Sequence, residues 1–179
     1  DIRNISNKDF EEYLQNVEEA ELSDAFWEVA LIQSLDSSAS TSPYFSVFLA
    51  SQVKANDRGF LSKDITIRDL IMNKGDRHHI FPREYLKKNG MKQGQYNQIA
   101  NYVYMQSEIN IRIKDKPPNI YFRELREQCS EGALQYGGIT DPQALKENLL
   151  MNSVPEDIFS MDISDYEDFL MKRRLQMPE

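Results

Sequence analysis

The sequence predicts an α+β fold that is mostly α-helical, with a short strand–strand–helix (ββα) unit embedded between N- and C-terminal helical segments. Apolar residues recur at helical spacing in the first and last parts of the chain, whereas the middle holds two short apolar runs of the kind that forms strands. At 179 residues, 40% of them hydrophobic, the chain is long enough for one domain with a packed core. We therefore expect a single domain with three consecutive parts, residues 1–73, 74–116 and 117–179.

The first part, residues 1–73, is predicted to be helical apart from a serine-rich loop at 36–42. Phe10, Tyr13, Leu14 and Val17 have the i, i+3, i+4, i+7 spacing of one helix face, and we interpret such apolar stripes as core residues. The predicted helices are residues 9–14 after Ser6, a helix through 26–31 after Ser23-Asp24, 44–53 after Pro43, and 67–72 after Thr66.

The middle part, residues 74–116, has the pattern of a ββα unit, and the last part, residues 117–179, returns to helices. The predicted middle elements are a strand at 79–81 ended by Pro82, a helical turn at 83–88 stopped by Asn89-Gly90, a strand at 102–105, and a helix at 108–114 capped by Ser107. After a break at Pro117-Pro118, the predicted helices are 121–128, 141–151 opened by Asp141-Pro142, and 165–176 capped by Ser164.

Composition indicates the compartment of the protein and the kinds of site that it can contain. The single cysteine, Cys129, excludes a disulfide framework and every cysteine-based zinc site, and it suits a reducing, cytoplasmic compartment. No apolar run approaches the length of a membrane span, so we expect no membrane partner. The chain lacks an initiator methionine and ends just after a charged helical pattern, which leads us to expect the C-terminal fragment of a longer protein.

Positive charge is concentrated in the middle part of an acidic chain. The window from Lys74 to Lys116 holds nine basic and four acidic residues, a balance of +5, so the remainder of a chain with net charge −8 carries −13. Such a basic island favours a site that faces a polyanion. Surface exposure is the simpler interpretation of any one of these residues, but six are candidates for phosphate contacts: Arg77, Arg83, Lys87, Lys88, Arg112 and Lys114.

The only two histidines, His78 and His79, stand side by side in this basic window. Imidazole exchanges protons near neutral pH and binds divalent metal ions. Because neighbouring residues of a strand point to opposite faces, we expect different roles for the two, one toward a metal ion and one toward water. Asn110, in the helix predicted after the second strand, is placed to face them as a further ligand. Taken alone, a histidine pair is more often structural than catalytic.

The spacing of these residues resembles a known nuclease signature. HHIFP at 78–82, NQIANYV at 97–103 and SEIN at 107–110 together resemble the signature of HNH, or His-Me finger, endonucleases, whose fold is a ββα-metal motif. The wider order is similar to the C-terminal nuclease domain of GmrSD-like (type IV restriction, anti-phage) proteins. In that domain an HHIFP segment, an NxIANY-like segment, a Lys-Asp-Lys-Pro-like run and an Arg-rich closing helix follow one another.

The resemblance implies a role for each matching residue. His79 would be the general base that activates water, and His78 would bind the metal ion together with Asn110. Asn101 would hold the loop between the strands by hydrogen-bonding its backbone, so that His79 points correctly. The cofactor would be a single Mg²⁺ or Mn²⁺, because asparagine at position 110 favours a hard, weakly held cation. Water attack on phosphorus would leave a 5′-phosphate and a 3′-hydroxyl.

The predicted function is therefore metal-dependent cleavage of DNA, by the effector domain of a restriction or anti-phage protein. The resemblance to GmrSD-like proteins implies that a nucleotide-hydrolysing (NTPase) and targeting domain precedes it in the full-length protein. Nothing in this chain resembles that domain, so NTPase activity is not assigned to it. Two alternatives stay open: a catalytically silent nucleic-acid- or protein-binding module with the same fold, and a nuclease that cuts RNA. The sequence also leaves open whether one strand or both are cut, and which sequence or modification is recognised.

Overall fold

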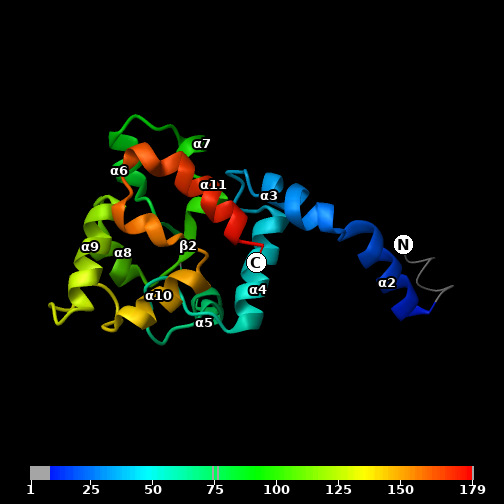
Figure 1. Ribbon diagram of the computed structural model, residues 1–179, viewed down its shortest axis with the longest axis horizontal. Helices are drawn as coiled ribbons and strands as arrows, with labels where there is room; N and C mark the ends of the chain where they lie inside the picture. The colour runs from blue at the N-terminus through cyan, green and yellow to red at the C-terminus, as the bar shows by residue number, and fades with distance from the viewer. Residues whose placement is uncertain (1–8, 74, 76, 179) are drawn as a thin grey trace.

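The computed structural model describes residues 9–73, 75 and 77–178, and over these ranges the chain is mostly helical with one two-stranded antiparallel sheet (Figure 1). The predicted α+β class is therefore confirmed. Elements marked η are 3-10 helices, except η1, which is π-helical. In chain order the elements are α2 (Phe10–Glu21), η1 (Phe26–Ala30), α3 (Leu31–Ser34), α4 (Pro43–Ala55), α5 (Ile67–Met72), β1 (Arg77–His79), α6 (Arg83–Lys88), α7 (Gln93–Tyr96), η2 (Ile99–Asn101), β2 (Tyr102–Tyr104), α8 (Ser107–Ile113), α9 (Pro118–Gln128), α10 (Pro142–Met151), η3 (Glu156–Ser160), η4 (Ile163–Asp165) and α11 (Tyr166–Gln176).

Several helices begin where local capping chemistry predicts. Thr66 and Asp69 form a reciprocal capping box at the start of α5, and Pro43 is the first residue of α4. At α10 the Asp141 side chain accepts a hydrogen bond from the Ala144 N–H. These short-range hydrogen bonds satisfy backbone N–H groups that a helix leaves free, so they fix the starting residue without tertiary contacts.

Other predicted starts are wrong by one to three residues. Gln106 is the N-cap of α8 and Ser107 is its first residue, while Asp165 caps α11 and Ser164 lies inside η4. Helix α9 begins at Pro118, three residues before the predicted start, because proline is well tolerated in the first turn of a helix. Ser6, the predicted cap of the first helix, lies outside the described residues, and Asp9 caps α2 instead.

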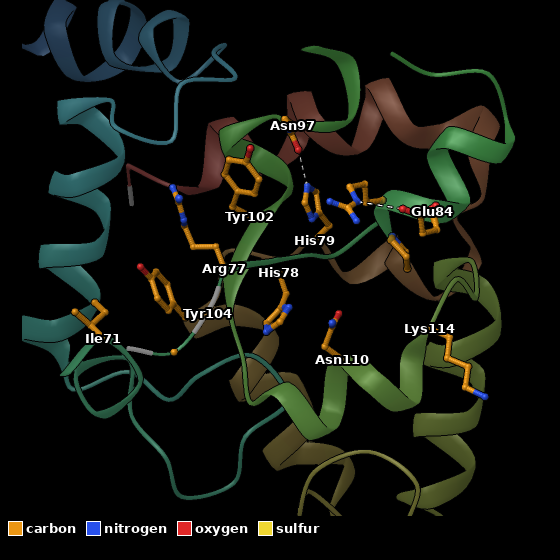
Figure 2. A pocket seen from close by; sticks show the side chains of 13 residues that line it. Ile71, Arg77, His78, His79, Glu84, Asn97, Tyr102, Tyr104, Asn110 and Lys114 are labelled. Carbon is orange, nitrogen blue, oxygen red and sulfur yellow. Dashed lines mark hydrogen bonds and ion pairs between the residues drawn. The ribbon is translucent and has the colours of Figure 1, made fainter. Parts of the chain in front are cut away.

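The sheet pairs β1 with β2 in antiparallel register, with His78 opposite Val103 and His79 opposite Tyr102. The first strand therefore lies two residues earlier than the predicted range, 79–81. Beyond His79 the Ile80 N–H still donates to the Asn101 carbonyl, at 3.0 Å, whereas the Phe81 N–H donates to the Asn101 side chain, at 2.8 Å, and the regular pairing ends there. Figure 2 shows the two histidine side chains leaving β1 in different directions.

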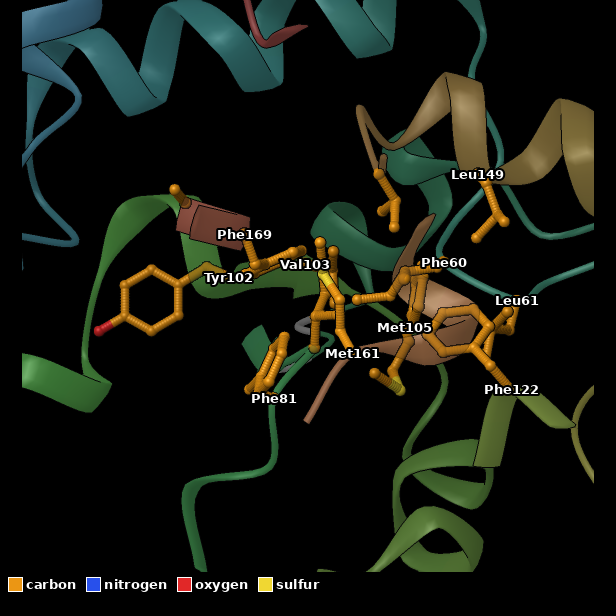
Figure 3. Close-up of a cluster of buried hydrophobic side chains, with 14 of the residues drawn as sticks. Phe60, Leu61, Phe81, Tyr102, Val103, Met105, Phe122, Leu149, Met161 and Phe169 are labelled. Carbon is orange, nitrogen blue, oxygen red and sulfur yellow. The ribbon is translucent and has the colours of Figure 1, made fainter. Parts of the chain in front are cut away.

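The core lies directly beneath the sheet and continues through the C-terminal part of the chain. One connected cluster of buried apolar residues runs from Leu31 to Met177 and includes members of all three predicted parts. Figure 3 shows Val103, which belongs to β2, and Phe81, which follows β1, among these side chains. The Phe81 ring lies 4.9 Å from that of Phe169 in α11. The residues next to the histidines are thus fixed by the core, which gives the site a rigid base.

The apolar stripe of α2 is not part of this core, contrary to the prediction. Phe10, Leu14 and Val17 are 55%, 47% and 39% exposed, and no residue of α2 is buried. In Figure 1, α2 extends away from the body formed by α4 to α11. The 3.6-residue period predicts the helix correctly, but it does not say what covers the apolar face. Among the described helices, none has both the length and the hydrophobicity needed to cross a membrane.

Candidate active site

A pocket of about 860 Å³ lies against the sheet and α8 and contains both histidines. Its lining includes Arg77, His78 and His79 from β1, Asn97 from the loop before β2, and Asn110 from α8. In Figure 2, the His79 ring points toward Asn97, and the His78 ring points the other way and lies beside Asn110. The expectation of opposite strand faces is met only in part, because the two histidines point apart but share one pocket.

The backbone on the C-terminal side of His79 is fixed by buried contacts. Ile80 and Phe81 are 0% exposed, and the Tyr121 hydroxyl from α9 donates to the Ile80 carbonyl at 2.9 Å. The Ile80 N–H donates to the Asn101 carbonyl at 3.0 Å. His79 is the last paired residue of β1 and precedes two fully buried side chains, so its backbone has little freedom to rotate and its imidazole starts from a defined position.

Asn101 ties the two sides of the loop between the strands together. Its Oδ1 accepts from the Phe81 N–H at 2.8 Å, and its Nδ2 donates to the carbonyls of Phe81, at 3.1 Å, and Tyr96, at 3.2 Å. The side chain is 0% exposed and does not line the pocket. Asn101 therefore acts on the backbone around His79 and Asn97 and has no contact with the space where a substrate would lie.

Asn97, to which the sequence analysis gives no role, is the direct partner of His79. The Oδ1 atom of Asn97 lies 3.0 Å from Nε2 of His79, and an amide oxygen only accepts. Nε2 therefore carries the proton and donates, which leaves the lone pair on Nδ1. The rings of Tyr96 and Tyr102 meet the imidazole edge-on, at 6.4 and 5.1 Å. Asn97 lies within the motif that carries the resemblance. Because 18 residues separate it from His79 along the chain, the sequence does not indicate that the two are in contact.

The environment keeps His79 neutral near pH 7. Burial lowers the pKa of His79 below its ordinary value of 6.5, and the hydrogen bond with Asn97 offsets part of this effect by raising the pKa. The nearby positive charges of Arg83 and Arg77, together with His78, lower the pKa further. A neutral imidazole with one nitrogen held by an acceptor is the form that can take a proton from water.

Replacing Asn97 by aspartate is expected to raise the midpoint at which His79 titrates, because a carboxylate beside Nε2 favours the imidazolium form. The wild-type midpoint should lie below 6.5. The folded protein binds this proton less tightly than the unfolded chain does. His79 therefore contributes to the free energy of unfolding above pH 6.5, and this contribution is lost as the pH falls through the pKa that His79 has in the folded state. The two imidazole resonances can be followed by NMR, with His78→Gln to assign them.

The matched control for this titration is Asn16→Asp, which adds the same charge to α2, the helix that lies far from β2 and α8 in Figure 1. It should leave the His79 midpoint unchanged. A midpoint above 6.5 in the wild type, or equal midpoints in the wild type and Asn97→Asp, would contradict the arrangement of His79 and Asn97.

The donor set around His78 is small and consists of one imidazole and one amide. His78 offers an imidazole nitrogen and Asn110 an amide oxygen, and both side chains are half-buried. Within the described ranges, no group of three or more His, Cys, Asp or Glu side chains is arranged to hold a metal ion. Structural zinc sites need four such ligands, whereas Mg²⁺ commonly keeps several waters and takes one or two protein ligands plus substrate phosphate. These two residues could supply two ligands to a cation that keeps several waters, and they are too few for a closed zinc site.

The six candidate phosphate-binding residues divide into two groups. Arg77, Arg83 and Lys114 line the pocket, and the Arg77 guanidinium lies 5.7 Å from the centroid of the Tyr102 ring. The others are engaged elsewhere: Lys87 pairs with Glu84, Lys88 with Asp115, and Arg112 donates to the Gln135 carbonyl. Glu84, which also lines the pocket, is 3.2 Å from Nε of Arg83. The structure thus brings three of the six basic side chains to the histidines.

Comparisons of the chain with protein-family models, with curated proteins and with solved structures each gave no match. Likeness to another protein therefore assigns neither a family nor an activity to the chain.

Proposed function

We propose that the chain is a metal-dependent endonuclease of the HNH type that hydrolyses phosphodiester bonds in DNA, with β1, β2 and α8 as its ββα-metal motif. The observation that carries the proposal is the convergence of both histidines with Asn110 and three basic side chains in one pocket. Phosphodiester hydrolysis needs a base for water, positive charge at the phosphate, and a rigid support for both. The pocket offers residues suited to each of these tasks.

In this proposal His79 is the general base. Its Nε2–H is held by Asn97, and its pKa is lowered by burial, so the neutral form is present at physiological pH. The free lone pair on Nδ1 then takes a proton from the water that attacks phosphorus. Asn101 and Asn97 act as positioning residues, since they hold the backbone and the ring without touching the reacting atoms.

His78 and Asn110 are the residues that would hold Mg²⁺ or Mn²⁺. Bound there, the cation would neutralise charge on the phosphate and on the leaving oxygen. Arg77, Arg83 and Lys114 would bind the phosphates on either side of the scissile bond, because they line the same pocket. Each of these contacts is with the backbone of the nucleic acid, so the pocket gives no sequence preference by itself.

The charge of the whole chain supports a role as an effector that is targeted by something else. Outside residues 74–116 the net charge is −13, which disfavours general binding to DNA. We therefore propose that a further domain of a longer protein, with NTPase or modification-sensing activity, delivers this domain to its substrate in a restriction or anti-phage setting.

His78→Ala and Asn110→Ala should each raise the Mg²⁺ concentration needed for half-maximal nicking by about 10-fold or more, because even outer-shell changes at metal sites cost this much. Mn²⁺ binding, followed by electron paramagnetic resonance, should weaken in parallel and gives a readout that does not depend on activity. Asn89→Ala, on the exposed end of α6, is the matched control and should change neither. Unchanged metal titrations in both variants would remove His78 and Asn110 from the metal site.

A further inference from the structure

Helix α11 contacts the backbone of the segment that carries Asn97 and Asn101. The Tyr166 hydroxyl, from the first residue of α11, donates to the Gln95 carbonyl at 3.0 Å and lies 3.4 Å from the Tyr96 carbonyl. Tyr166 is 0% exposed, and its ring packs 5.1 Å from that of Phe81. One side chain of α11 therefore anchors the two residues that immediately precede Asn97.

A second side chain of α11 anchors the other end of the same segment. Nη1 of Arg173 donates to the carbonyls of Ala100 and Tyr102, both at 2.8 Å, and Nε and Nη2 donate to the Asn152 carbonyl at 3.2 and 3.0 Å. Arg173 is 1% exposed, and burial lowers its pKa to about 9, which leaves it charged at neutral pH. Ala100 and Tyr102 are the two neighbours of Asn101, so the guanidinium holds the backbone on both sides of it.

Tyr166 and Arg173 hold the segment Gln95–Tyr102, which forms little sheet pairing of its own. Between α6 and β2 the chain forms only the short α7 and η2, and its side chains must nevertheless place the Asn97 amide 3.0 Å from the His79 ring. Asn101 adds its bonds to Phe81 and Tyr96 from inside the segment. The segment is thus fixed at both ends by one helix, and α11 in turn is fixed by packing of Phe169 on Phe81.

We propose that Tyr166 and Arg173 make α11 the positioning element of the site, which orients Asn97 and through it the imidazole of His79. Neither residue lines the pocket, so both are positioning residues that act through the backbone of Gln95–Tyr102. The catalytic consequence rests on the proposed function of His79 as general base. A merely structural role would change the thermal stability of the protein and leave the His79 ring as it is.

The test is Tyr166→Phe, which removes one hydroxyl and keeps the buried ring. The readouts are the Nε2–H proton resonance of His79 at neutral pH, the thermal unfolding temperature, and kcat and KM for nicking. The matched control is Tyr85→Phe, whose hydroxyl accepts from the Ile163 N–H at 3.0 Å and not from the segment that carries Asn97. Arg173→Lys is the second variant, because a lysine ammonium keeps the charge but lacks the planar fork that reaches three carbonyls.

Tyr166→Phe and Arg173→Lys should both broaden or remove the His79 Nε2–H resonance and lower kcat by about 10- to 100-fold with KM unchanged, as expected for a misplaced catalytic group. Tyr85→Phe should retain the resonance and the rate. If both variants fold and keep the wild-type resonance, the inference is overturned, whatever the activity. If the resonance is lost in the variants while the wild type does not cut nucleic acid, the positioning role is supported and the nuclease function is refuted.

Discussion

Replacement of His79 by alanine is expected to slow nicking by a factor of about 10² to 10⁴, the usual contribution of a general base. The physical reason is the loss of the neutral imidazole that Asn97 orients and burial keeps deprotonated. Rates should be measured in a single turnover at saturating Mg²⁺, so that binding and product release do not contribute. The half-maximal Mg²⁺ concentration should stay near that of the wild type, since the His79 ring points away from His78 and Asn110 (Figure 2).

Two controls make this result specific. Added imidazole should restore part of the activity of His79→Ala, because the cavity left by the ring can admit a free base, and it should have no effect on His78→Ala. Thermal unfolding of the variant should stay within a few degrees of the wild type. Equal nicking by His79→Ala and the wild type would show that another group takes the proton.

Replacement of Asn101 by alanine is expected to destabilise the protein by about 3 kcal/mol or more. The change leaves the buried N–H and carbonyl of Phe81 without their side-chain partner, and each unsatisfied buried group costs about 1–3 kcal/mol. This is a large fraction of the ~5–15 kcal/mol that stabilises a typical domain. Urea denaturation followed by circular dichroism measures the change.

The matched control is Asn16→Ala on the exposed face of α2, where the side chain donates only to the Glu12 carbonyl. It should change the free energy of unfolding by no more than about 0.5 kcal/mol. Asn101→Asp is a useful intermediate, because it keeps an acceptor for the Phe81 N–H but loses both donated bonds. A cost below about 1 kcal/mol for Asn101→Ala would mean that the loop is held mainly by α11 and the core.

The sequence predicts those parts of the fold that depend on neighbouring residues. The starts of α4, α5 and α10 follow from Pro43, from the Thr66–Asp69 capping box and from Asp141, and each involves groups within three residues of one another. The same is true of β2, whose β-branched and aromatic run is found within one residue of its predicted range. Local propensity is sufficient where no distant contact competes with it.

Features that depend on distant contacts could not be predicted. Just after the first strand, the Phe81 N–H donates to the side chain of Asn101, which lies 20 residues away in the chain. The apolar stripe of α2 has a core-like period but is exposed. Four short helices, α7, η2, η3 and η4, carry no periodic signal and were not predicted.

In the candidate site, too, some features could be predicted from the sequence and others could not. His78, His79 and Asn110 are found together in one pocket, as their spacing suggests, whereas Asn97 and the anchors from α11 carry no signal that links them to His79. Of the basic residues, only Arg77, Arg83 and Lys114 reach the pocket, because charge patterning along the chain does not say which side of a helix faces the site.

The most direct test of the central claim is incubation of the wild-type chain with supercoiled plasmid DNA in Mg²⁺ or Mn²⁺, with EDTA as the control and a single-stranded RNA of matched length in parallel. Metal-dependent conversion to nicked circles with 5′-phosphate ends, and no conversion in EDTA, is the predicted result. Cleavage of the RNA without nicking of the plasmid would show that the substrate is RNA and not DNA. If the protein is folded but the plasmid stays supercoiled and the RNA stays intact with either metal, the nuclease proposal is contradicted. The alternative of a catalytically silent binding module would then be favoured.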